Sequence, residues 1–214
     1  MSPATTSSGP GRPKDLGKRQ AILEAAKVLF LCKGYDGSSM EAIAAEAGVS
    51  KLTVYSHFND KENLLCAAVQ AKCAEQMPEL FGEPPANASV EELLLSLARR
   101  FNQLINSPEA IALSRLMVAQ GGQSPRLSKL FFDAGPRRML DQIERLFAHA
   151  QQSGALHFDN PRHAAEHFLS LVQGCVHFRL LLGCVEPPGE EGSEWHVREV
   201  VELFLRAYSP SAGS

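Results

Sequence analysis

The sequence has 214 residues, of which 44% are hydrophobic and 21% charged, and its formal net charge is −3 at pH 7. These proportions are those of an ordinary globular protein with one large or two small domains, and they exclude a polycation that coats nucleic acid without selectivity. No stretch is apolar over the roughly 18 residues that a membrane helix needs, and the polar N-terminal segment lacks the apolar core of a signal peptide. We therefore expect a soluble cytoplasmic protein that makes no contact with a membrane.

Charge is distributed unevenly along the chain. Residues 1–65 contain 8 Lys and Arg against 7 Asp and Glu, whereas residues 66–214 contain 13 against 17. A slightly basic end on an acidic body suits a protein that touches a polyanion at one end only. A solvated tail is the alternative explanation for the basic residues near the N-terminus, which are Arg12, Lys14, Lys18 and Arg19.

The spacing of apolar residues predicts helices along almost the whole chain, and no alternating pattern predicts a strand. The fold class expected is therefore all-α. Residues 1–15 are rich in Ser, Pro and Gly and should form a disordered basic arm. Capping residues, prolines and glycines delimit the helices, which we place at about 16–33, 38–47, 51–58, 60–77, 89–105, 108–117, 127–133, 136–147, 161–182 and 193–208, with a connection at 81–88.

Residues 38–58 read SSMEAIAAEAGVSKLTVYSHF and have the layout of a helix-turn-helix. Two short helices join through a turn at Gly48, where a side chain would resist the backbone geometry. Ser38 is expected to cap the first helix in a capping box with Glu41. The face that packs the two helices together comprises Ile43, Ala44, Ala47, Val49, Val54 and Phe58. The polar positions of the second helix are left outward, and a helix of this size fits the major groove of DNA.

A longer string of residues resembles the N-terminal domain of TetR/AcrR-type transcriptional regulators over about residues 18–66. It comprises Gly34-Tyr35, Ser38-Ser39, Ile43-Ala44, Ala47-Gly48-Val49-Ser50, Thr53, Tyr55, Phe58, Lys61 and Leu64-Leu65. The resemblance implies that residues 16–65 form the DNA-binding domain and that the third helix is the recognition helix. By position, Lys51, Leu52, Thr53 and Tyr55 would face bases or adjacent phosphates. The phosphate backbone would be held by Ser38, Tyr55, His57 and Lys61.

Leu52 departs from the family pattern, which often has a small residue at this position. Its side chain either reads a thymine methyl group or packs against the first helix. The basic residues of the N-terminal arm would reach the neighbouring minor groove, as basic arms do.

Residues 115–183 resemble the ligand-binding domain of AefR-like repressors. The resemblance rests on RLMVAQGGQSPRLSKLFFDAGPRRMLDQIERLFAHAQQSGAL followed by DNPRHAAEHFLSLVQG. It implies that residues 66–210 bind a ligand and form a homodimer through the last two long helices. Wide apolar stripes on 161–182 and 193–208 agree with a dimer, because such helices need cover on more than one side. Packing within one monomer is the alternative.

The same resemblance implies an effector pocket among the C-terminal helices. Candidates are apolar side chains, for which plain core packing is the alternative, and polar ones embedded in apolar faces, because a buried polar group needs a partner. They are Phe101, Asn102, Leu113, Met117, Gln120, Phe132, Gln173 and His177. The subfamily often has an acidic residue where this chain has Gln120, so a role for that carboxylate does not carry over.

Two other chemical signals are set aside. His163, Glu166 and His167 match the HxxEH pattern of a metalloprotease family, but no third ligand or β element accompanies them. Cys66 and Cys73 could form a redox switch, although small buried side chains are the simpler interpretation. We therefore expect no enzyme, catalytic residue, metal site or cofactor.

The function predicted is a cytoplasmic, ligand-responsive repressor, associated with the bacterial nucleoid when bound to DNA. It would bind a palindromic operator as a homodimer, and a small, largely apolar effector would release it. An activator, a regulator that needs its ligand to bind DNA, and a metal- or redox-sensing regulator are the alternatives.

Overall fold

The computed structural model describes residues 15–80 and 88–210. Within these ranges the chain forms ten α-helices and no strand, which confirms the all-α class. The helices are α1 (Leu16–Lys33), α2 (Met40–Glu46), α3 (Lys51–Phe58), α4 (Lys61–Leu80), α5 (Val90–Ile105), α6 (Pro108–Gly121), α7 (Pro125–Ala134), α8 (Pro136–Gln152), α9 (Pro161–Leu182) and α10 (Glu190–Tyr208). The arm expected at 1–15 and the connection expected at 81–88 lie outside the described residues, except for Asp15 and Ala88.

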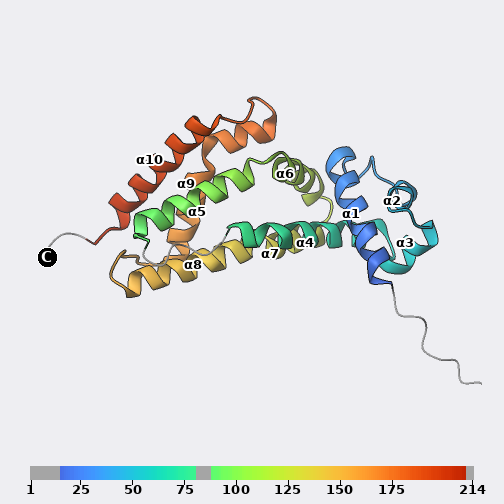
Figure 1. Ribbon diagram of the computed structural model, residues 1–214, viewed down its shortest axis with the longest axis horizontal. Coiled ribbons are helices and arrows are strands. Elements are labelled where there is room, and N and C mark those ends of the chain that lie inside the picture. The colour runs from blue at the N-terminus through green and yellow to red at the C-terminus, as the bar shows by residue number, and fades with distance from the viewer. Residues whose placement is uncertain (1–14, 81–87, 211–214) are drawn as a thin grey trace, which may run out of the picture.

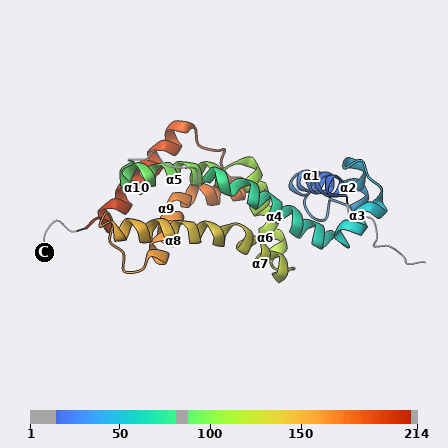
Figure 2. The same cartoon turned by 60° about the horizontal axis from the view of Figure 1, so that its bottom comes forward.

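The molecule is elongated, with a small head at one end and a larger helical body at the other (Figure 1). Helices α1, α2 and α3 form the head, and α5, α8, α9 and α10 lie farthest from it. Helix α4 runs from the head into the body, and the turned view shows this most clearly (Figure 2). Among the described helices, none is long and apolar enough to cross a membrane.

Local sequence sets most helix ends. Gly34, with φ of 71°, ends α1 in a conformation that glycine adopts without strain. A capping box formed by Ser89 and Glu92 is present at the start of α5. Asn160 caps α9 ahead of Pro161. Helix α10 begins at Glu190, three residues before the expected start at Ser193.

The capping box predicted at Ser38 is wrong. The cap of α2 is Ser39, whose hydroxyl accepts a hydrogen bond from the amide of Ala42 at 3.1 Å. Ser38 turns inward instead, and its hydroxyl is 3.0 Å from the carbonyl oxygen of Leu29 and 2.8 Å from that of Gly34. Burial explains the difference, because a hydroxyl excluded from water must find a partner inside the protein.

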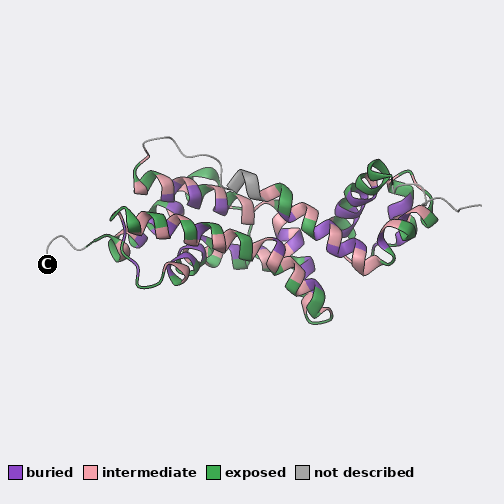
Figure 3. Ribbon diagram, turned by 90° about the horizontal axis from the view of Figure 1, so that it is seen from below, coloured by how far each residue is buried: buried purple, intermediate pink, exposed green. Residues whose placement is uncertain are grey.

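Buried side chains form two clusters, and the facing sides of the helices carry them (Figure 3). One cluster fills the head and continues along α4 to α6 and α7, where Leu113, Leu116 and Leu127 join it. The other joins α5, α8, α9 and α10 around aromatic rings, among which Phe168 packs edge-to-face on Phe147 and Phe204. The head is therefore packed onto α6 and α7 through continuous apolar contact.

Helix α9 is interrupted in its middle. Gly174 has φ of 58° and ψ of −177°, which is not a helical conformation. The imidazole of His196, from α10, lies against this glycine, where an added Cβ would be 3.0 Å from Cε1. Near the break the carbonyl of Val172 accepts hydrogen bonds from Nε2 of His196 at 3.0 Å and from Nδ2 of Asn102 at 3.4 Å. Helices α5, α9 and α10 thus share one polar junction.

Candidate functional site: the helix-turn-helix and an inner cavity

The helix-turn-helix packs as its sequence predicts. Gly48 has φ of 65° in the turn between α2 and α3, and Ser50 caps α3 by accepting from the amide of Thr53. Ile43, Val54 and Phe58 are buried between the helices. This packing leaves Lys51, Leu52, Tyr55 and Ser56 exposed on the outer surface of α3.

Ser38 does not belong to that outer surface. Its side chain is 2% exposed, and both of its hydrogen bonds are to backbone carbonyls inside the head. The hydroxyl expected to hold a phosphate therefore lies inside the head, where Ser38 ties α1 to the start of α2.

Leu52 projects away from the protein. It is 80% exposed, so the packing against the first helix that the sequence left open does not occur. A solvent-exposed apolar side chain at the start of α3 is available for contact with another apolar group, such as the methyl of thymine.

The basic side chains of this surface already have partners. The ammonium of Lys51 is ion-paired with Glu41 of α2, and it lies 5.8 Å from the centre of the Tyr55 ring. Lys61, at the first position of α4, lies 4.1 Å from the centre of the Tyr35 ring. Such cation–π contacts hold a lysine in place while its charge stays accessible.

The remaining candidates on α3 are partly buried. The hydroxyl of Thr53 is 2.8 Å from that of Ser50. Nδ1 of His57 is buried without a hydrogen-bond partner among the described residues. Arg19 lies over the ring of Phe58, 5.1 Å from its centre, whereas Arg12 and Lys14 of the expected arm lie outside the described residues. One surface at the end of the molecule thus collects most of the predicted DNA contacts.

The body contains a cavity of about 380 Å³ whose wall is mostly apolar. Helices α4 to α9 all contribute to it. Its size is within the range of pockets that hold drug-sized ligands. The apolar wall includes Phe101, Leu104, Leu113, Phe131, Met139 and Leu169.

Half of the predicted effector residues line this cavity. They are Phe101, Leu113, Gln173 and His177. Four others lie elsewhere. Asn102 bonds the carbonyl of Val172, and Met117 packs in the cluster that continues from the head. Gln120 is buried in the last turn of α6, off the cavity wall, and Phe132 is 45% exposed on α7.

Sequence reasoning missed the contribution of α4 to the cavity wall. Cys73 and Gln76, one helical turn apart, both line it. Cys73 also packs on Gly135, where an added Cβ would be 3.1 Å from its sulfur. The only sequence signal is the presence of a small residue, Gly135, on which the larger Cys73 could pack. This pairing cannot be recognised before the fold is known.

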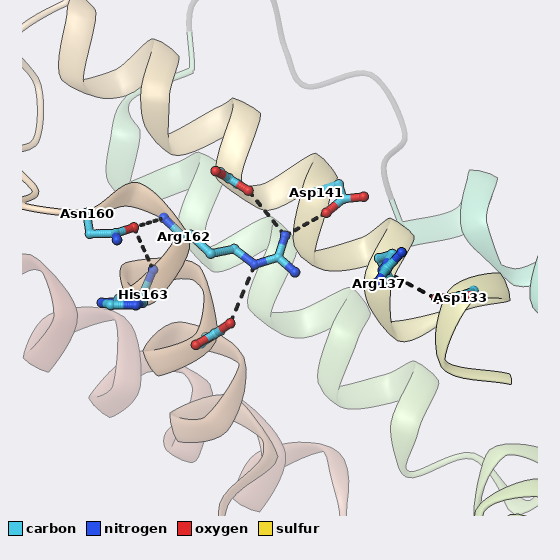
Figure 4. Close-up of polar contacts among 8 residues, drawn as sticks. Asp133, Arg137, Asp141, Asn160, Arg162 and His163 are labelled. Atoms are coloured by element: carbon cyan, nitrogen blue, oxygen red, sulfur yellow. Dashed lines mark hydrogen bonds and ion pairs between the residues drawn. The ribbon is translucent and has the colours of Figure 1, made fainter. Parts of the chain in front are cut away.

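One end of the cavity lies beside a network of charges on α8 and α9. Nη1 of Arg162 is 2.6 Å from Asp141 and 3.2 Å from Glu144, and its Nε is 3.5 Å from Glu166 (Figure 4). Hydrogen bonding to Asp141 is the main reason that the pKa of Arg162 is raised. Glu166 is the acidic residue among the described residues of the cavity wall, and it shares Arg162 with Asp141 and Glu144.

The HxxEH residues do not assemble. Glu166 pairs with Arg162, Nδ1 of His167 is 2.9 Å from the hydroxyl of Tyr208, and His163 is exposed. Within residues 15–80 and 88–210, no three His, Cys, Asp or Glu side chains gather as a metal ion requires. All five cysteines are free, and Cys66 and Cys73 are buried as expected. Burial raises the pKa of Cys73 to about 11, so this thiol stays protonated at neutral pH.

Helix α4 connects the cavity to the predicted DNA-binding surface. It carries Lys61 at its first position and Cys73 on the cavity wall. Its first turn is bonded to the start of α7, through Ser124 to Glu62 at 2.8 Å and through Arg126 to Asn63 at 2.7 Å. A displacement of α4 at the cavity would therefore also displace Lys61 at the head.

Large apolar side chains are exposed on the outer faces of α9 and α10. Trp195 is 64% exposed, and the others are Phe178, Leu182 and Leu203. These four side chains come from two helices that contact each other.

Comparison with known proteins agrees with this organisation. Residues 22–68 match the family model of bacterial regulatory proteins of the tetR family, and residues 92–210 match the C-terminal domain of AefR-like transcriptional repressors. The HTH-type transcriptional regulator YdeS of Bacillus subtilis is 29% identical over 89% of this chain and 89% of its own. The HTH-type transcriptional repressor AcnR of Corynebacterium diphtheriae is 28% identical over 91% of this chain and 94% of its own.

Solved structures give the same assignment. A TetR-family transcriptional regulator from Mesorhizobium loti superposes with a TM-score of 0.83 at 28% identity, covering 93% of this chain and 100% of that one. The flavonoid-responsive regulator FrrA superposes with a TM-score of 0.79 at 32% identity, covering 92% and 100%. These relatives are regulators rather than enzymes. The chain belongs to the TetR family of helix-turn-helix transcriptional regulators.

Proposed function

We propose that this protein is a ligand-responsive repressor that binds a palindromic operator as a homodimer and releases it when a small, largely apolar effector enters the cavity. The observation that carries the proposal is the position of α4, which forms part of the cavity wall and bears Lys61 at its other end. The sign of the response is inferred from relatives named as repressors, AcnR of Corynebacterium diphtheriae and BdcR of Escherichia coli.

Residues 16–65 are the proposed DNA-binding domain. Its contacts with bases would come from Lys51, Leu52, Thr53 and Tyr55, which lie on the first two turns of α3. His57 and Lys61 would hold phosphates. Ser38 is left out of this set because its hydroxyl is committed inside the head.

Residues 66–210 are the proposed ligand-binding and dimerisation domain. The exposed apolar side chains of α9 and α10 would meet their copies across a two-fold axis. A two-fold dimer places the two recognition helices about 34–36 Å apart, one turn of DNA, so the operator would be a pseudo-palindrome.

Phe178→Arg should shift the protein to a monomer in ultracentrifugation and weaken operator binding. Val118→Arg, a change at an exposed apolar residue of α6, is the matched control.

In this proposal the effector acts by changing the populations of two positions of α4. A ligand that binds one position of α4 better than another shifts the protein toward that position, and thereby changes the placement of the head. Ligand and DNA then weaken each other's binding by the same factor. FrrA is named as flavonoid-responsive, so flavonoids are the first compounds to test.

A gel-shift titration with the DNA around the protein's own gene tests the function. We expect a retarded band at low salt that a flavonoid panel weakens. Tighter binding with ligand would instead identify a regulator that needs its ligand to bind DNA. No band at low salt would overturn the DNA-binding role, and bands that no ligand changes would overturn the ligand response.

A further inference from the structure

One polar side chain on the cavity wall is almost wholly enclosed. His177, on α9 just beyond the break at Gly174, is 5% exposed and lines the cavity. Its Nδ1 is 3.0 Å from Oδ1 of Asn106. An amide oxygen can only accept a hydrogen bond, so Nδ1 carries the proton and donates it. The neutral ring then has a lone pair on its other nitrogen, Nε2.

Nε2 of His177 has no hydrogen-bond partner among the described residues. Burial lowers the pKa of His177, which keeps the ring neutral at pH 7 and keeps Nε2 an acceptor. His177 thus brings to the cavity wall an acceptor to which no described residue donates, so a ligand that supplies a donor is favoured over one that does not. The other uncharged polar side chains of the wall are less buried than His177; they are Gln76, Ser114, Ser170 and Gln173.

The charges around the cavity disfavour an ionic ligand. No Lys or Arg is among the described residues of its wall, so a carboxylate or phosphate would enter without a counter-ion. A cation would meet one acidic residue, Glu166, whose carboxylate is exposed to solvent and already lies 3.5 Å from Arg162. The cavity is therefore suited to a molecule without charge.

We propose that the cavity binds an uncharged, largely apolar molecule bearing a phenolic or alcoholic hydroxyl, which donates its hydrogen bond to Nε2 of His177. Asn106 is a positioning residue, because it fixes the tautomer that leaves Nε2 free to accept. The inference rests on the proposed function in taking this cavity as the effector site, and it adds the chemical class of the effector.

Three matched probes test the class: para-hydroxybiphenyl, its methyl ether para-methoxybiphenyl, and the corresponding biphenylcarboxylate. Binding to the full-length protein is measured by calorimetry at neutral pH without DNA. The hydroxyl compound should bind about tenfold more tightly than the ether, the ratio expected when one buried hydrogen bond is lost. The carboxylate should bind more weakly than both. Equal binding of phenol and ether, tighter binding of the carboxylate, or no binding of the phenol at millimolar concentration would each overturn the proposal.

Variants locate the effect at His177. His177→Phe keeps a ring but removes the acceptor, so phenol and ether should bind with equal affinity. Asn106→Leu should reduce the phenol-to-ether ratio and shift the ring-nitrogen NMR signals of His177. Cys175→Ala, a change at an exposed residue of α9 that does not line the cavity, is the control and should leave the ratio unchanged. A ratio that persists in His177→Phe would overturn the assignment, and the wild-type comparison stands even where a variant does not fold.

These outcomes are separate from those of the proposed function. If the phenol is preferred but operator binding does not change, the ligand response fails while the chemical class stands. If other compounds release DNA and no hydroxyl preference is found, the class fails while the response stands.

Discussion

Lys51, the first residue of the recognition helix, is ion-paired with Glu41 of α2 across the helix-turn-helix. The hydrogen bond to Lys51 lowers the pKa of Glu41, and the bond to Glu41 raises the pKa of Lys51. The lysine is thus held at the surface before DNA arrives, but its charge is partly cancelled. Contact with DNA would require Lys51 to exchange this carboxylate for a base or a phosphate.

Glu41→Gln should therefore strengthen DNA binding. The change removes the competitor of Lys51 and a negative charge beside the phosphates, and exposed pairs of this kind predict an effect of about two- to fivefold. Fluorescence anisotropy with operator DNA measures it. Glu46→Gln, on the same helix, makes the same change in net charge without freeing Lys51. Equal gains in both variants would show that net charge alone is responsible.

Lys61→Ala should weaken operator and unrelated DNA equally, because a phosphate contact carries no sequence information. With about eight cationic phosphate contacts per dimer, the logarithm of affinity should fall with the logarithm of salt concentration with a slope near −7, and this variant should reduce the slope by about 2.

Thr53→Ala should instead relax selectivity at particular base pairs and leave the salt slope unchanged. Measuring both variants on a set of operators with single base changes separates the two roles. A uniform loss for Thr53→Ala would remove it from the base-reading set.

Cys66 and Cys73 should resist thiol reagents in the native protein. Burial raises the pKa of both thiols, that of Cys73 to about 11, so little thiolate exists at pH 8. Cys32, which is exposed on α1, should react rapidly. Peptide mapping after pulse labelling, with and without denaturant, gives the rates. Labelling of Cys73 as fast as Cys32 would revive a redox role.

Acid should weaken the junction of α5 and α10. Glu194 accepts two hydrogen bonds from Arg99, each of 2.7 Å, and these lower its pKa from 4.5 to about 2. The folded protein therefore binds the proton less readily than the unfolded chain, so this contribution to stability is complete above pH 4.5 and is lost as pH falls toward 2.

Glu194→Gln removes that contribution, and the difference in free energy of unfolding between wild type and variant should shrink across this range. Urea titrations at several pH values measure the difference. Glu199→Gln, on the same helix, is the control. A difference that does not change with pH would contradict the assigned cause.

The head of the protein was predictable because its determinants are local. Gly34, Gly48 and Ser50 act within a few residues of their own positions, and the apolar spacing sets which face of α3 is buried. The wrong prediction at Ser38 shows where local sequence is not sufficient. Two adjacent serines can each cap α2, and only the fold shows which one is buried beneath α1.

The cavity was predictable only in part, because its wall brings together residues from six helices. Periodicity identifies Phe101 and Phe132 equally as apolar, but α5 faces the body whereas Phe132 lies on the outer side of α7. Asn102 and His177 both stood out as polar residues on apolar faces. Their partners, Val172 and Asn106, are about 70 residues away in sequence, and no local pattern reveals them.

The break at Gly174 makes this position sensitive to substitution. Any other residue there would have to adopt φ of 58° and displace the ring of His196. Because Gln173 and His177 lie on the cavity wall on either side of the break, such a change would move both of them at once. Genetic screens for unresponsive mutants should therefore recover position 174, although glycine has no side chain with which to touch an effector or DNA.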